Sequence, residues 1–391
     1  MDLWVCLFWI CNGVLFMAYL AYPLIATAIV SLKGSRPAYA GLQDSGLPVV
    51  AFIVPAFNEE TVIDDKIRNT LELDYPYGRL RVIVVTDGSD DATSVLTASH
   101  PEVLHLHGSL RRGKPHAMNR GAQAGGDAEL LVFSDANTQL APYALRSLVA
   151  PFVDPRVGAV CGEKRVQGRE EAAASGEGVY WGYESRLKSL DSAIGSVVGP
   201  VGELLAIRAG LWRELPEDTV LDDLQIGLQI CMEGSRVAYA GDAVAVEPVS
   251  RSLSDEWERK VRIAAGAFQS LGRFRRLLNP FRHGVVSLQF WLRKVIRWVL
   301  CPPALLLVLP ASYFAFAGGG EPRWLFLAAF AGWSLFAILA LAGPIFRRIL
   351  PGELRMLQYP FYFCFMHAAT VAGLMRHLHG RQSVLWRKAD R

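Results

Sequence analysis

Residues 131–138 read LVFSDANT, a short apolar stretch that ends in an acid, a small residue and an amide. Four more Val- and Ile-rich stretches of similar length lie between residues 49 and 162, and polar segments of helical character separate them. Short strands that alternate with helices are typical of a mostly parallel sheet covered by helices on its faces. We therefore predict an α/β fold with strands over residues 49–54, 81–86, 103–106, 130–133 and 157–162.

Polar residues follow three of these strands at the point where each one ends. Asn58 and Glu59 follow the first strand, Asp87 follows the second, and Asp135 with Asn137 follows the fourth. In open α/β sheets, ligands bind in the crevice beyond the carboxyl ends of the strands. We therefore expect the three loops to converge on a single site.

Apolar segments flank this α/β region, for which we predict the boundaries 47–280. The chain has 391 residues, 52% of them hydrophobic, and a mean hydropathy of +0.24, which is too apolar for an ordinary soluble enzyme. Residues 3–32 form an apolar run longer than the ~20 residues that span a bilayer, and Lys33 and Arg36 follow it. This pattern predicts an uncleaved membrane anchor at residues 1–33, with the next domain in the cytoplasm.

The C-terminal part predicts further membrane association. Residues 281–299 mix tryptophans with arginines, as an interfacial amphipathic helix does. Residues 300–379 contain three apolar segments, and a basic tail follows at residues 380–391. We predict a multi-pass protein of the inner (plasma) membrane. Three C-terminal spans would place the basic tail outside, against the positive-inside tendency, so either the last segment is re-entrant or one span is miscounted.

Charge and cysteine content exclude two other classes of function. The formal net charge is only +3, and the basic residues cluster beside the apolar segments, so we predict no nucleic-acid partner. The six cysteines form no CxxC pair, which argues against a disulfide framework and against a zinc site.

The first two loops carry groups that can hold a nucleoside. In residues 54–60, VPAFNEE, the strand breaks at Pro55 and Phe57 can present its ring to a planar base, although a plain strand-to-helix connection fits equally well. Asp87 can accept a hydrogen bond from a uracil imide or a ribose hydroxyl. Alternatively, Asp87 only caps the helix that follows.

The next two loops suit a diphosphate and a metal. Residues 111–121, RRGKPHAMNRG, place three cations including Lys114 beside a glycine and a helix N-terminus, which favours an anion, unless this is merely a solvated basic loop. Asp135 and Asn137 offer two oxygen ligands at a strand end. Such ligands can bridge a ribose and a divalent cation that neutralises a departing diphosphate.

The ordered set PAFNEE, TDGSDDAT, GKPHAMNRG, SDAN, GPVGELLAIR and LDD resembles the motifs of family-2 glycosyltransferases with the GT-A fold. The similar branch contains the cellulose, poly-N-acetylglucosamine and hyaluronan synthases, and the match covers residues 49–271. This resemblance implies an inverting hexosyltransferase that moves a sugar from a UDP-sugar to a membrane-associated glycan or lipid acceptor. It also implies Mg²⁺ or Mn²⁺ as cofactor and a role in exopolysaccharide or glycolipid biosynthesis.

The resemblance assigns roles on the donor side. The residues implied for the base pocket are Pro55, Ala56, Phe57 and Glu59. Asp87 would bind the uracil or ribose, Lys114 would lie near the diphosphate, and Asp135 with Asn137 would hold the nucleotide sugar and the metal. The family usually has an aspartate where this chain has Asn137, so we expect weaker metal binding.

On the acceptor side, the resemblance assigns Gly202 to the segment that approaches the sugar, although it can also be an ordinary turn glycine. Asp222 and Asp223 match an acidic pair whose second member is the general base, which takes the proton of the acceptor hydroxyl. A helix N-cap is the alternative for Asp223. Arg262 matches the arginine that contacts the diphosphate.

The chain departs from the family near Arg262, where the glutamine and tryptophan of processive synthases are missing. Tyr180, Trp181 and Tyr183 either replace that tryptophan as an aromatic acceptor platform or belong to the core. This departure favours single transfer. The alternatives are a processive polysaccharide synthase with accessory export proteins, and a catalytically degenerate membrane scaffold or nucleotide sensor.

Overall fold

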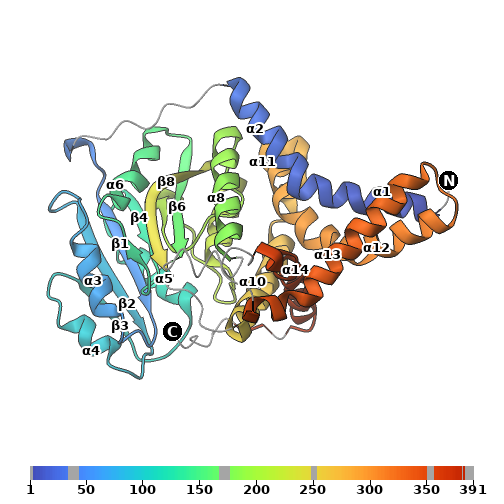
Figure 1. The fold of residues 1–391 in the computed structure, drawn as a ribbon. Coiled ribbons are helices and arrows are strands. Elements are labelled where there is room, and N and C mark those ends of the chain that lie inside the picture. Colours follow the sequence, from blue (N-terminus) through green and yellow to red (C-terminus); the bar gives the residue numbers. More distant parts are fainter. Residues whose placement is uncertain are drawn as a thin grey trace.

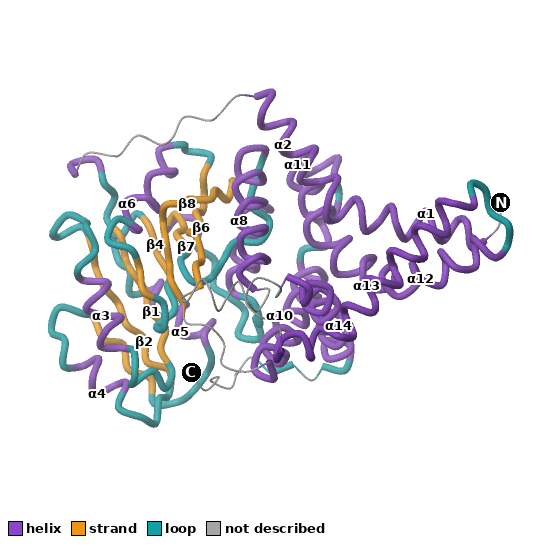
Figure 2. The backbone as a smooth tube through the Cα atoms, viewed as in Figure 1, coloured by secondary structure: helices purple, strands orange, loops and turns teal. Residues whose placement is uncertain are grey.

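The computed structural model describes residues 3–33, 44–166, 177–247, 253–349, 356–380 and 382–383. An α/β domain is joined to a bundle of long helices that extends away from it (Figure 1). The strands are confined to the α/β domain (Figure 2). The predicted fold class is confirmed.

An eight-stranded sheet in the order β3-β2-β1-β4-β7-β6-β8-β5 forms the centre of the α/β domain. β1 (Val50–Ala56) pairs in parallel with β2 (Leu80–Asp87) and with β4 (Leu130–Phe133), and β2 pairs in parallel with β3 (Leu104–Gly108). Because these strands run in one direction, their carboxyl ends lie at one edge of the sheet, where the predicted loops begin.

The second half of the sheet is mixed. β7 (Leu205–Arg208) runs antiparallel between β4 and β6 (Val157–Val166). β8 (Arg236–Glu247) pairs in parallel with β6 and antiparallel with β5 (Gln139–Leu140). All five predicted strands are therefore present, and β5, β7 and β8 were not predicted.

Both faces of the sheet are buried, which explains why β1 is apolar along nearly its whole length. Val50 and Phe52 pack into one core, and Ala51 and Ile53 pack into the core on the opposite face. The helices of the first core are α3 (Ile63–Leu71), α4 (Thr93–Ala98) and α6 (Ala144–Val149). Those of the second core are α5 (Lys114–Gln123) and α9 (Asp222–Met232).

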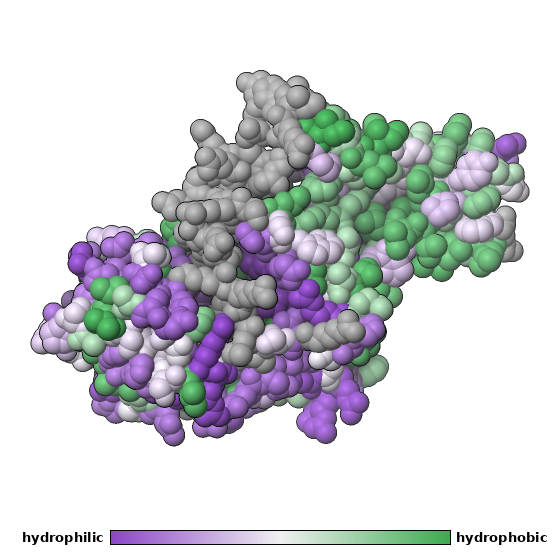
Figure 3. Space-filling view, turned by 90° about the horizontal axis from the view of Figure 1, so that it is seen from below, coloured by the Kyte–Doolittle hydropathy of each residue, from purple (hydrophilic) through white to green (hydrophobic). Residues whose placement is uncertain are grey.

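Three helices in the described part of the chain are long and apolar enough to cross a membrane: Leu3–Lys33, Pro280–Ala317 and Arg323–Phe346. On the face that Figure 3 shows, the region of the long helices is mostly hydrophobic and the α/β domain is mostly hydrophilic. The segments of these helices are α1 (Leu3–Phe16), η1 (Met17–Ala21), α2 (Tyr22–Lys33), α11 (Pro280–Phe290), η6 (Trp291–Leu300), α12 (Cys301–Ala317) and α13 (Arg323–Ile349). Short 3-10 turns complete the described elements: η2 (Asp44–Gly46), η3 (Ala150–Val153), η4 (Ala209–Leu211) and η5 (Arg275–Leu278).

The arginines of η6 point into the protein. Arg293, whose side chain is 1% exposed, bonds to Asp191 at 2.7 Å and to Glu184 at 3.0 Å, and Arg297 bonds to Glu184 at 2.6 Å. Both acids belong to α8 (Glu177–Ile194), a helix of the α/β domain. The segment predicted as a separate interfacial helix is therefore continuous with α12, and its cations join the long apolar helices to the α/β domain.

α14 (Tyr359–Leu378) packs along α10 (Leu253–Arg273), the helix that carries Arg262. The helices touch at Gly373, where a Cβ atom would overlap Ala264 of α10, and the Tyr362 hydroxyl donates to Glu256 at 2.8 Å. α14 is not among the three helices that meet the length and hydropathy of a membrane span. Whether the last apolar segment is re-entrant or one span is miscounted therefore stays a prediction.

Candidate active site

Reciprocal hydrogen bonds join the loop after β1 to the loop after β2. The Asn58 amide donates to Asp90 at 2.5 Å, and the Asp90 N–H donates back to the Asn58 side-chain oxygen at 3.1 Å. The Glu59 N–H donates to Thr93 Oγ1 at 2.7 Å. The two predicted nucleoside loops therefore form one continuous wall at the carboxyl edge of the sheet.

The residues predicted for a base pocket lie together on this wall. Pro55 and Ala56 are the last two residues of β1, and Phe57 and Glu59 follow at once. The Arg111 guanidinium lies 3.6 Å from the centroid of the Phe57 ring, a distance typical of a cation–π contact. Phe57 and Arg111 together therefore offer flat surfaces of the kind that stack on a planar base.

Asp87 orders the chain that leads into α5. Its carboxylate, in a residue only 4% exposed, accepts from the Arg112 N–H at 3.1 Å and from the Gly113 N–H at 2.6 Å. It does not cap α4, whose N-cap residue is Ala92. Asp87 thus fixes the position of Lys114, the first residue of α5.

Gly88 permits the close approach of these two loops. Its φ of +67° is in the left-handed region, and a Cβ atom there would overlap the backbone nitrogen of Arg111. We expect Gly88→Ala to displace Arg111 and to weaken UDP binding measured by calorimetry. Gly78→Ala is the matched control, because Gly78 has a φ of +81° and no atom within 4 Å of its Cβ position. Both variants should lose on the order of 1 kcal/mol of stability through the left-handed φ, and Gly88→Ala should lose more because its Cβ overlaps backbone atoms. Equal UDP binding by both would contradict the role of the contact.

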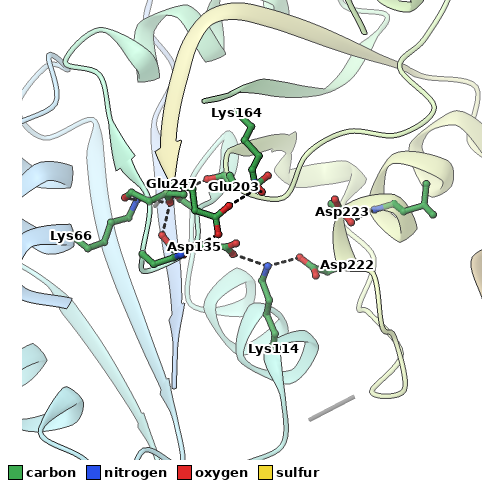
Figure 4. A network of polar contacts seen from close by, with 12 residues as sticks. Lys66, Lys114, Asp135, Lys164, Glu203, Asp222, Asp223 and Glu247 are labelled. Atoms are coloured by element: carbon green, nitrogen blue, oxygen red, sulfur yellow. Dashed lines mark hydrogen bonds and ion pairs between the residues drawn. The ribbon is translucent and has the colours of Figure 1, made fainter. Parts of the chain in front are cut away.

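Lys114 joins the two sides of the site. Its ammonium lies 2.7 Å from Asp135, at the end of β4, and 3.0 Å from Asp222, at the start of α9 (Figure 4). Burial alone would lower the pKa of Lys114, but the two carboxylates outweigh it and raise this pKa above its ordinary value. Lys114 is therefore protonated at neutral pH, and its ammonium joins the predicted donor loop to the predicted acceptor loop.

Asp223 lies beside this bridge and is half-buried. Its withdrawal from water, together with the negative charges of Asp222 and Glu203, raises the pKa of Asp223 to about 7. Its Oδ1 accepts from the Leu224 N–H at 2.7 Å, and the N-cap of α9 is Leu221, so Asp223 is not the N-cap. Gly202 faces it directly, since a Cβ atom at Gly202 would lie 3.4 Å from the Asp223 Cβ.

Arg262 reaches the same acids from α10. It interacts electrostatically with Asp222, Asp223 and Asp135, and its guanidinium donates to the Val220 carbonyl at 3.4 Å. The structure therefore brings the predicted residues Lys114, Asp135, Asp222, Asp223 and Arg262 together. Their assigned roles stay predictions.

A buried ionic group that the sequence did not predict lies near Asp135 (Figure 4). Lys164, with a side chain 2% exposed, forms ion pairs with both Glu203 and Glu247. The Asn137 amide nitrogen donates to Glu247 at 3.2 Å. Glu203 follows Gly202 in a recognised motif, but Glu247 ends β8 without any local signal and is brought here only by the pairing of β6 with β8.

Lys66 was missed as well. It is fully buried in α3 and donates to Ser134 Oγ at 2.8 Å and to the Thr138 carbonyl at 2.9 Å, the two ends of the SDAN turn. Burial lowers the pKa of Lys66 to about 7. This lysine supports the turn that presents Asp135 and Asn137.

The donors at this turn fit a divalent cation only in part. Among the residues that the structure describes, no group of three or more His, Cys, Asp or Glu side chains could hold a metal ion. Asp135 supplies a carboxylate, and Asn137 turns its amide nitrogen to Glu247, which leaves the amide oxygen for a cation. Mg²⁺ commonly binds one or two protein oxygens and takes its other ligands from substrate phosphates and water. The turn therefore suits a metal held jointly with a diphosphate.

Residues 48–266 match the model of a protein family described as Glycosyltransferase like family 2. The chain is 25% identical over 265 residues to the poly-beta-1,6-N-acetyl-D-glucosamine synthase of Staphylococcus aureus strain COL, and 23% identical over 262 residues to that of Staphylococcus epidermidis. Each alignment covers 64% of this chain and 62% of the relative, so the chain spans less than two thirds of the length of these curated relatives.

One solved structure is similar over nearly the whole chain. It is a mannosyltransferase from Pyrobaculum calidifontis in complex with GDP-Man and Mn²⁺, with a TM-score of 0.71 and 25% identity. The match covers 97% of this chain and 100% of the mannosyltransferase chain, so it includes the long apolar helices as well as the α/β domain.

Proposed function

The chain belongs to the glycosyltransferase like family 2, and on that basis we propose that it transfers a sugar, with inversion, from a UDP-sugar to a membrane-associated acceptor. One observation carries the proposal: Lys114 contacts both Asp135 of the donor loop and Asp222 of the acceptor loop. A single cation between the two loops supports a reaction in which the diphosphate leaves on one side and the acceptor attacks from the other.

We propose that the donor lies across the carboxyl edge of the sheet. The base stacks in the pocket of Phe57 and Arg111, and the diphosphate lies between Lys114 and Arg262. Asp135 and Asn137 would hold Mg²⁺ or Mn²⁺, which neutralises the charge that develops on the leaving diphosphate. The similar mannosyltransferase was solved with GDP-Man and Mn²⁺, which makes a GDP-sugar the second candidate donor.

In the proposed reaction, Asp223 accepts the proton of an acceptor hydroxyl as the hydroxyl oxygen attacks the anomeric carbon. The bond from that carbon to the diphosphate oxygen breaks, and the nucleoside diphosphate leaves on the opposite face. The raised pKa of Asp223 matches this task, because a general base works best when its pKa lies near the pH of the reaction. Lys114 and Arg262 stabilise the departing charge.

We also propose that the α/β domain is cytoplasmic. With Leu3–Lys33, Pro280–Ala317 and Arg323–Phe346 as the spans and α14 beside α10, the end of α14, which carries Arg376, falls on the same side as the α/β domain. That placement agrees with the positive-inside tendency and removes the conflict that a fourth span would create.

The experiment is a donor panel with the full-length protein in lipid nanodiscs that contain lipids of its source membrane. UDP- and GDP-sugars are supplied with Mn²⁺, the released nucleoside diphosphate is measured, and the product is sized. We expect UDP release with one donor and a lipid-extractable product that carries a single sugar. A long water-soluble polymer would support the processive alternative instead, and nucleotide binding without any release would support the sensor alternative.

Asn137→Asp should strengthen metal binding, because it adds a charge to the ligand pair. We expect the Mn²⁺ concentration for half-maximal UDP release to fall about tenfold. Without metal, the new carboxylate would repel the nearby carboxylate of Glu247 and destabilise the variant. Mn²⁺ with UDP should therefore raise the Tm of this variant more than that of the wild type. Asn279→Asp is the control, since Asn279 is the N-cap of α11, a position where Asn and Asp are nearly equivalent. An unchanged Mn²⁺ requirement would remove position 137 from the metal site.

A further inference from the structure

A groove of about 740 Å³ lies among the membrane helices, outside the site described above. We propose that it binds the hydrocarbon tail of the acceptor lipid. This inference rests on the proposed transfer to a membrane-associated acceptor, and it names the chemical class of that acceptor: a lipid with at least one long apolar chain.

The walls of the groove come from segments that are far apart in the sequence. Trp9 and Phe16 belong to α1, Trp333 and Phe336 to α13, and Phe363 to α14. Trp9 and Phe16 are each 53% exposed, so the groove opens beside the N-terminal helix. α1 and α13 lie in helices long and apolar enough to cross a membrane, so in the proposed membrane placement this opening faces lipid. The volume is in the range of ~300–1,000 Å³ that ligand pockets commonly have.

Four polar side chains in the walls, those of Asn12, Tyr19, Tyr183 and Trp333, already have partners inside the protein. Trp333 Nε1 donates to the Asn12 side chain at 3.1 Å, and the Asn12 amide donates to the Phe8 carbonyl at 2.9 Å. The Tyr19 hydroxyl bonds to His367 at 3.0 Å, and the Tyr183 hydroxyl donates to the Tyr19 carbonyl at 2.9 Å. A sugar chain in this groove would have to exchange its hydration for few new hydrogen bonds, which is unfavourable. A hydrocarbon chain has no such cost.

The groove reaches the α/β domain at Tyr183 of α8. Tyr183, which lines it, accepts a hydrogen bond from Arg297 of η6 at 3.0 Å. Lys294 lies one helical turn before Arg297. The Lys294 ammonium lies so close to Gly199 that a Cβ atom there would overlap it. Lys294 also interacts electrostatically with Asp223. A lipid whose tail lies in the groove can therefore extend its head group past η6 toward the proposed base.

Gly13 allows the groove to be filled without disturbing its walls. It lines the groove, and no atom lies within 4 Å of its Cβ position. Gly13→Phe should fill the groove. Gly332→Phe is the matched control, because Gly332 is exposed on α13, has no atom within 4 Å of its Cβ position and does not line the groove.

The test uses the full-length protein in nanodiscs, with two photoreactive diazirine probes: a phospholipid labelled in its acyl chain and a polyprenyl phosphate labelled in its chain. Labelled positions are mapped residue by residue, because the outer faces of α1 and α13 meet probe lipid in every variant. We expect one probe to label the groove residues Trp333 and Phe336 in the wild type and in Gly332→Phe, and not in Gly13→Phe. Transfer to lipid should fall about tenfold or more in Gly13→Phe, as expected when a buried apolar chain loses its site, while UDP binding stays unchanged.

The outcomes separate this inference from the proposed function. Labelling that persists in Gly13→Phe, or full transfer by that variant, would overturn the inference and leave the proposed glycosyl transfer intact. If the wild type makes only a long polymer, or transfers no sugar with any donor, the proposed function itself fails. The probe that labels distinguishes an acyl from an isoprenoid tail.

Discussion

We expect Asp223→Asn to abolish sugar transfer and to leave UDP binding intact. The amide keeps the size of the side chain but cannot accept the acceptor's proton, and general base catalysis typically contributes about 100- to 10,000-fold. The diphosphate contacts proposed for Lys114 and Arg262 do not depend on this side chain. UDP release and UDP binding by calorimetry provide the two measurements.

Asp242→Asn is the control for this substitution, because Asp242 is exposed on β8. It should retain full activity. Transfer that survives in Asp223→Asn would remove Asp223 as the base. A joint loss of UDP binding would instead make it a donor ligand.

The pH dependence of the wild type should reveal the same carboxyl. Burial and the neighbouring acids raise the pKa of Asp223 to about 7, so kcat/KM should rise with pH and level off above about 7. The folded protein binds this proton more tightly than the unfolded chain, so ionisation of Asp223 destabilises the fold as the pH rises from about 4 to about 7. Asp223→Asn should therefore have a higher Tm than the wild type at pH 8, and a similar Tm at pH 4. A lower Tm for the variant at pH 8 would contradict the raised pKa.

Asp135→Ala should lose both transfer and nucleotide binding, in contrast to Asp223→Asn. The substitution removes the one carboxylate of the proposed metal turn and leaves Lys114 with Asp222 as its remaining acidic partner. Loss of the metal would cost several kcal/mol of transition-state stabilisation, and about 4 kcal/mol corresponds to a 1,000-fold lower rate. Addition of EDTA to the wild type should reproduce the effect.

Asp127→Ala is the control for Asp135→Ala. Asp127 lies shortly before β4, its side chain is 83% exposed, and it pairs only at the surface with Arg81. It should leave UDP release unchanged. Full activity of the wild type in EDTA would exclude the metal from the reaction, whereas full activity of Asp135→Ala would exclude the whole donor turn.

The sequence predicted the part of the molecule that depends on local patterns. β1, β2 and β4 are mostly apolar stretches that end in polar loops, and because parallel strands end at one edge, the placement of Asp87 and Asp135 at the same edge of the sheet followed from the fold class. β7 and β8 were not predicted. β7 is only four residues long, and β8 joins the sheet through partners from about 80 residues earlier in the chain.

The remaining site residues were not predicted for the same physical reason: their partners lie far away in the sequence. Glu247 and Lys164 meet only because β8 pairs with β6, and no local motif marks either residue. The arginines of η6 pair with Glu184 and Asp191 on α8. Because these partners lie about 100 residues away, the local sequence pattern indicated a lipid surface instead. Hydrophobicity alone likewise could not show that α14 packs along α10.

The position of UDP and Mn²⁺ in an experimental structure of the full-length protein is the most direct test of the proposed reaction centre. We predict that the diphosphate lies between Lys114 and Arg262, with Mn²⁺ on the Asp135 side and Asp223 facing the open side of the cleft. A nucleotide bound elsewhere, or an Asp223 carboxylate turned away from the diphosphate, would contradict the proposal.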